Sequence, residues 1–128
     1  MAVGLSAANL ANKWLDMLRN TAFSEIAETH VKLHTGDPGA NGTANASAVT
    51  TREALSLDAA SGGSVSLTGT PPSWTMTGTE TISHISIWTD ATTGSFLWSA
   101  ALATPKPVEA DDTLTLTACG LSLTPVAA

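Results

Sequence analysis

Apolar residues recur at helical spacing in one part of the chain, close to its beginning. The apolar positions of this run stand three or four residues apart: Ala7, Leu10, Ala11, Trp14, Met17 and Leu18. Ser6 precedes the run and is a residue type that caps helices by accepting a backbone N–H bond. The pattern predicts one amphipathic α-helix over residues 6–20, whose apolar side must pack on its own sheet or on a partner subunit.

From residue 29 onward the pattern has the two-residue period of β-strands. Val31 and Leu33 alternate with polar neighbours over residues 29–35, which is typical of a half-buried strand. Further candidate strands cover residues 51–57, 64–68, 73–77, 81–89, 95–101, 113–118 and 121–126, separated by Gly and Pro. The expected core residues are Ile82, Ile85, Ile87, Phe96, Leu97, Leu114, Leu116, Leu121 and Leu123. The sequence therefore predicts a mainly β fold: one antiparallel, jelly-roll-like β-sandwich domain over residues 1–128, with the N-terminal amphipathic α-helix.

A polar stretch over residues 36–47 separates the first two predicted strands. It contains two glycine-containing turn signals and almost no apolar residue. Loops of this length without secondary structure usually carry function or are mobile until they bind. We therefore predict that the loop contacts a partner, and the candidate contact residues are Gly36, Asp37, Pro38, Gly39 and Asn41.

Two of the four tryptophans are further interface candidates. Trp74 follows two prolines, whose rigid extended backbone favours an outward-pointing side chain. Trp14 lies on the apolar side of the predicted helix. Exposed tryptophan is a frequent anchor of protein interfaces, although packing in the core is the favoured role of each residue taken singly.

The charge of the chain excludes several classes of function. Only 12% of the residues are charged, the net charge is −6, and the five basic residues form no stripe that could follow a phosphate backbone, so we expect no nucleic-acid partner. No apolar run reaches the roughly 18 residues of a membrane span, and the start of the chain lacks a signal-peptide pattern. Cys119 has no second cysteine to pair with, so we expect a buried thiol and synthesis in a reducing cytoplasm. A weakly charged surface is cheap to desolvate, which favours self-association as a trimer or ring.

No motif in the sequence predicts catalysis or a bound metal. His30 and His34 share one side of a predicted strand and His84 lies on another, but no metal-binding motif surrounds them. The polar loop lacks the residue order of a calcium-binding loop, and no Gly-x-Ser-x-Gly nucleophile motif occurs. We expect a protein that is not an enzyme and that requires no cofactor or metal.

Four segments of the chain, taken in order, resemble a family of small virion structural proteins of tailed bacteriophages, described as tail-fibre-like, minor tail or head-decoration proteins. The resemblance runs from about residue 5 to residue 124. The matching segments are the opening helix with Asn12-Lys13-Trp14, the turn Gly36-Asp37-Pro38-Gly39, the strand Ile85-Ser86-Ile87-Trp88 with Gly94, and the closing Asp112-Thr113-Leu114.

The resemblance implies a non-enzymatic, β-rich component of a virion that is assembled in the cytoplasm of the host bacterium. We expect a head-decoration protein that docks on the major capsid protein, because the chain is short and has neither coiled-coil heptads nor fibrous repeats. A tail-fibre or minor tail protein that contacts other tail proteins is the second hypothesis. A carbohydrate-binding β-sandwich that uses Trp74 or Trp98 as a stacking platform is the third.

Overall fold

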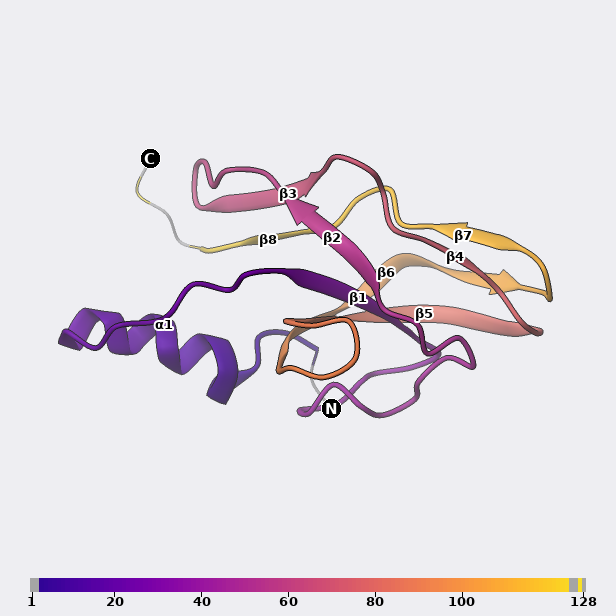
Figure 1. Cartoon of the computed structure of the whole chain (residues 1–128), viewed down its shortest axis with the longest axis horizontal. Helices are drawn as coiled ribbons and strands as arrows, with labels where there is room; N and C mark the ends of the chain where they lie inside the picture. Colours follow the sequence, from indigo (N-terminus) through magenta and orange to yellow (C-terminus); the bar gives the residue numbers. More distant parts are fainter. Residues whose placement is uncertain (1–2, 125–126, 128) are drawn as a thin grey trace.

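The computed structural model describes residues 3–124 and 127, and most of its regular structure is β-strand (Figure 1). The strands are β1 (Thr29–His34), β2 (Glu53–Leu57), β3 (Ser64–Thr68), β4 (Ser73–Thr75), β5 (Glu80–Trp88), β6 (Phe96–Val108), β7 (Thr113–Thr115) and β8 (Gly120–Ser122). Of the strand predicted over residues 121–126, the structure has β8, and Val126 lies outside the described residues.

The predicted N-terminal helix is confirmed, although its geometry changes along its length. A π-helical turn η1 (Ala7–Ala11) leads into the α-helix α1 (Asn12–Asp16) and a 3₁₀ turn η2 (Met17–Arg19). The hydroxyl of Ser6 accepts from the backbone N–H of Asn9 at 3.2 Å, as its N-cap position predicts. The helix ends at Asn20, which takes the left-handed conformation (φ 65°) that asparagine tolerates.

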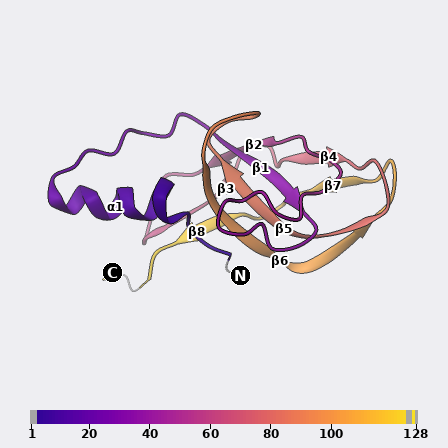
Figure 2. The same ribbon diagram turned by 90° about the horizontal axis from the view of Figure 1, so that it is seen from below.

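Two antiparallel sheets form the two layers of the fold. Six strands pair in the order β6-β5-β1-β2-β3-β8, and β4 pairs with β7 in a small second sheet. The large sheet is strongly curled (Figure 2), and residues from both sheets share one hydrophobic core. The prediction of a mainly β, antiparallel fold is confirmed.

The centre of the core is the pairing of β5 with β1 and β6. Ile87 lies opposite Val31 and Trp98, and Ile85 lies opposite Leu33, all of them buried. Five of the expected core residues are buried, which confirms the prediction for Ile82, Ile85, Ile87, Phe96 and Leu97. Three others are only partly buried against the core: Leu114, Leu116 and Leu121. The expectation was wrong for Leu123, which is 51% exposed because it lies beyond the end of β8.

The apolar side of the helix is only partly covered. Leu10 is buried and Trp14 half-buried, because η1 contacts β6 of the chain's own sheet. Met17 and Leu18 do not pack on the chain's own sheet, since they are 49% and 86% exposed, and their packing on a partner subunit stays a prediction. Figures 1 and 2 show the reason: the helix extends past the ends of the strands, so its last turn has no sheet beneath it.

Candidate functional site

The Gly36–Ser47 loop is folded back on the sheet. At its base, the N–H of Thr35 donates to Asn45 O at 2.8 Å and the N–H of Ser47 donates to Leu33 O at 3.1 Å. Farther out, the N–H of Ala44 donates to Pro38 O at 2.9 Å. The loop therefore has a hydrogen-bonded framework of its own. The sequence had predicted a loop without internal structure.

A buried hydrogen-bond chain anchors this loop to β1 and β5. His34 Nδ1 lies 2.8 Å from Ala44 O, His34 Nε2 lies 2.7 Å from Ser86 Oγ, and Trp88 Nε1 lies 2.8 Å from the same hydroxyl. Since a carbonyl only accepts and an indole N–H only donates, the directions follow for a neutral imidazole: Trp88 donates to Ser86, Ser86 donates to His34 Nε2, and His34 Nδ1–H donates to Ala44 O. We call this the Trp88–Ser86–His34–Ala44 chain.

Burial keeps the imidazole of His34 neutral, and the hydrogen-bond chain makes both of its nitrogens unavailable to a metal. The residue is fully buried, and this burial lowers the pKa of its imidazole. Both of its nitrogens have partners, and His84 Nδ1 lies 2.7 Å from its neighbour Ser83 Oγ. Within the part of the chain that the structure describes, no three His, Cys, Asp or Glu side chains are placed to hold a metal ion.

Gly42 holds the middle of the loop against an aromatic pair. It adopts φ +72°, and a Cβ at this position would lie 2.6 Å from Phe96 Cγ. Phe96 in turn packs against Trp88, with the ring centroids 5.7 Å apart. Only glycine allows both this backbone conformation and this close approach.

Arg52 braces the turn that connects β5 to β6. Its guanidinium lies 4.0 Å from the centroid of the Trp88 ring, and its Nη1 donates to Asp90 O at 3.0 Å and to Thr93 O at 2.6 Å. The backbone N–H groups of Thr92 and Thr93 lower the pKa of the Asp90 carboxyl by donating to it. The tip of the hairpin is therefore fixed to the segment that leads into β2.

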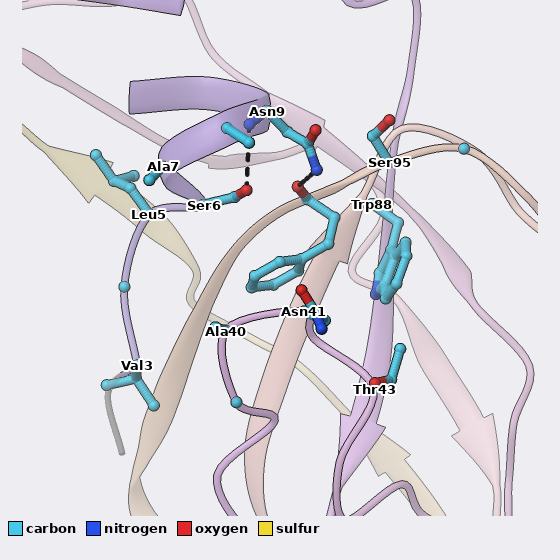
Figure 3. Close-up of a pocket in the computed structure, with 15 residues that line it drawn as sticks. Val3, Leu5, Ser6, Ala7, Asn9, Ala40, Asn41, Thr43, Trp88 and Ser95 are labelled. Atoms are coloured by element: carbon cyan, nitrogen blue, oxygen red, sulfur yellow. Dashed lines mark hydrogen bonds between the residues drawn. The ribbon is translucent and has the colours of Figure 1, made fainter. Parts of the chain in front are cut away.

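The N-terminal segment, the loop and the hairpin tip surround an open hollow of about 770 Å³ (Figure 3). Figure 3 shows Ala40 and Asn41 of the loop on one side and Ser6 and Asn9 on the other. Asn9 Nδ2 donates to Phe96 O at 2.9 Å, which ties the helix to β6. Among the described residues that line the hollow, none has an ionisable side chain, and the polar groups that they offer to a partner are amides and hydroxyls.

The predicted contact residues of the loop are divided between its two sides. Gly39 and Asn41 line the hollow, and Asn41 is exposed. Gly36 and Asp37 are half-buried near the base. The expectation was wrong for Pro38, which is fully buried on the inner side of the loop and cannot touch a partner.

The expectation of an outward-pointing Trp74 was wrong. Trp74 is 3% exposed, and its Nε1 donates to Thr51 O at 2.9 Å. The reason is the alternation of β4, in which Ser73 and Thr75 face outward and the residue between them faces the core. Trp98 is also buried, so neither residue can stack on a sugar, and Trp14 is half-buried at the edge of the core.

The features that sequence reasoning missed are the Trp88–Ser86–His34–Ala44 chain, the role of Arg52 and the hollow itself. The alternating pattern placed His34 on an outer face, and it is the loop that covers this face. A signal was present in the Asn41-Gly42 turn, since a glycine in a long loop can mark a close approach of the backbone to another element.

Comparison with protein families agrees with a structural role. The family model described as Podophage GP4 fiber I protein gp80 matches residues 5–124. A search of curated proteins gave no match. No helix among the described residues is long and apolar enough to cross a membrane. The match confirms the resemblance to phage virion structural proteins that the sequence indicated. Because it covers nearly the whole chain, the chain belongs to this phage fibre protein family.

Proposed function

We propose that the protein is a non-enzymatic subunit of a tailed-phage fibre, which contacts other tail proteins of the virion. The observation that carries the proposal is the family match over residues 5–124, whose description names a fibre protein. The same match gives no support to the head-decoration role expected from the short chain length. It favours the tail-fibre hypothesis instead.

The surface of the hollow supports a role in assembly. Its described lining residues carry no charged side chain, and each of its three walls is fixed by a hydrogen bond, from Asn9 to Phe96 O, from His34 to Ala44 O and from Arg52 to Asp90 O. A rigid, uncharged surface loses little conformational entropy on binding and is cheap to desolvate, as suits a contact with a neighbouring subunit. We assign Gly39 and Asn41 to this contact and expect the chain to assemble with copies of itself as a trimer or ring.

The placement of the titratable groups supports the absence of catalysis. His34 is enclosed in its hydrogen-bond chain, and none of the described residues that line the hollow has a side chain that could exchange a proton near neutral pH. A general acid or base needs access to its substrate within hydrogen-bond distance.

Imaging of virions labelled with an antibody against this chain tests the location. Label on the tail fibres is the expected result, and label distributed over the head would refute the proposal. Multi-angle light scattering of the purified protein tests the oligomeric state, for which a single monomeric species at high concentration would count against a trimer or ring.

A surface variant tests the hollow as the contact. Asn41→Arg adds a large charged side chain to an exposed position of the wall, while Thr70→Arg makes the same change at an exposed turn that does not line the hollow. We expect Asn41→Arg to reduce incorporation into virions and Thr70→Arg to leave it unchanged, with equal melting temperatures. Normal incorporation of Asn41→Arg would place the contact elsewhere.

A further inference from the structure

Asn41 and Gly42 form the only Asn-Gly pair in the sequence. Asn41 is exposed, whereas Gly42 is buried against Phe96. We propose that Asn41 is a site of spontaneous deamidation and that opening of the Gly36–Ser47 loop sets its rate. The proposal does not depend on the function assigned above.

The reaction needs only water and a trace of base. The main-chain nitrogen of Gly42 loses its proton to solvent base and attacks the side-chain carbonyl carbon of Asn41. A new C–N bond closes a five-membered imide, the bond from Asn41 Cγ to Nδ2 breaks, and this nitrogen takes up a proton and leaves as ammonia. Water then opens the imide at either carbonyl, which gives aspartate or isoaspartate. Glycine favours the attack because it has no side chain to crowd the nitrogen.

The closed loop opposes the first step in two ways. The N–H of Gly42 donates to Gly39 O at 3.2 Å, so the proton that must leave is held by a carbonyl. The Cα of Gly42 packs against the Phe96 ring, so the backbone cannot rotate toward Asn41 Cγ without separating from β6. The attack therefore requires a local opening of the loop, whose free energy lies below that of global unfolding.

The Trp88–Ser86–His34–Ala44 chain controls this opening. Ala44, two residues after Gly42, is the loop's acceptor for His34, and Asn45 Nδ2 adds a bond to Asp37 O at 2.9 Å. Removal of either bond should populate the open loop and speed the reaction.

Deamidation would change the wall of the hollow permanently. Either product adds one negative charge to a surface whose described lining residues carry no ionisable side chain. Isoaspartate also lengthens the main chain by one carbon directly before Gly42, which is packed closely against Phe96. The isoaspartate product should therefore disturb the closed position of the loop more than the aspartate product does.

Peptide mapping by mass spectrometry tests the proposal on the full chain kept in mildly alkaline buffer. It measures the conversion of each of the five asparagines, Asn9, Asn12, Asn20, Asn41 and Asn45. We expect Asn41 to convert faster than the other four asparagines. We also expect its rate to be at least about tenfold lower in the folded chain than in the chain unfolded by guanidinium. Equal rates in the folded and unfolded chain, or faster conversion of another asparagine, would overturn the proposal.

Two variants separate the role of the loop from general instability. His34→Ala should raise the deamidation rate at Asn41 severalfold. His84 lies directly opposite His34 in β5 but is not part of the Trp88–Ser86–His34–Ala44 chain, so His84→Ala should leave this rate unchanged. If His34→Ala does not fold, Asn45→Gly removes the bond to Asp37 O and keeps the left-handed backbone (φ 53°). An unchanged rate in a folded variant of either kind would show that the loop does not control the reaction.

Discussion

Ser86→Ala tests the buried chain that holds the loop on the sheet. Ser86 is fully buried, and its hydroxyl is the common partner of Trp88 Nε1 and His34 Nε2. The substitution removes one small oxygen and leaves the shape of β5 almost unchanged. Its effect on stability therefore comes from the two polar atoms that lose their partner.

The expected size of the effect follows from these two atoms. Each buried polar group without a partner costs about 1–3 kcal/mol, so the loss of a partner by two groups should lower the free energy of unfolding by about 2–6 kcal/mol. This is a large part of the roughly 5–15 kcal/mol that stabilises a domain of this size. Ser83→Ala is the matched control, since Ser83 is half-buried, lies on the same strand and has its hydroxyl 2.7 Å from Nδ1 of its neighbour His84. Its expected cost is about 0.5–1 kcal/mol.

Urea unfolding followed by tryptophan fluorescence measures both variants on one scale. The midpoint should fall much further for Ser86→Ala than for Ser83→Ala, with similar slopes. Equal shifts in the two variants would refute the reasoning, because they would show that water or a side-chain rearrangement satisfies Trp88 and His34 as well as the Ser86 hydroxyl does.

Three further predictions follow from single residues. Gly42→Ala should destabilise the protein by about 2–4 kcal/mol, because it combines strain at positive φ with a clash against Phe96, while Gly78→Ala, which has open space, should change stability by less than about 1 kcal/mol in urea titration. Because burial lowers the pKa of His34 from its ordinary 6.5, the unfolded chain binds more protons than the folded one as pH falls through that value. The free energy of unfolding should thus be at its highest above about pH 6.5 and should decrease below that pH. A His34→Gln variant whose free energy of unfolding had the same dependence on pH would contradict this prediction. Burial raises the pKa of the Cys119 thiol to about 11, so alkylation of the folded protein near pH 8 should be about a hundredfold slower than that of a free thiol; equal rates would show that the thiol is accessible.

The parts of the fold that could be predicted from the sequence are those that local periodicity determines. Ser6 and the spacing from Leu10 to Trp14 indicated the helix, and the alternation around Ile85 and Ile87 indicated the central strand, because side-chain direction repeats with the backbone geometry. Exposure at the ends of elements could not be predicted. Leu18 and Leu123 continue the apolar pattern, but whether a sheet extends beneath them is decided by the lengths of other elements.

The errors at the candidate site have a common physical cause. His34 and Pro38 were assigned from the polarity of their own segment, whereas their burial results from the loop closing over the outer face of β1. Trp74 was assigned from the two prolines before it, whereas pairing with β7 turns it toward the core. In each case a contact distant in the sequence overrides a local preference, and a single sequence contains no direct record of such a contact.

The hollow illustrates how a neutral surface can still be well defined. Its walls come from the N-terminal segment, the first loop and the β5–β6 turn, which are far apart in the sequence and meet at the start of β6. Each wall is fixed by polar bonds beneath the surface: Asn9 to Phe96 O, His34 to Ala44 O, and Arg52 to Asp90 O. The polar groups that give the surface its shape thus make their hydrogen bonds within the protein. The polar groups that remain at the surface are amides and hydroxyls. A partner that binds here must recognise shape and hydrogen-bonding groups rather than charge, so its affinity should depend only weakly on ionic strength.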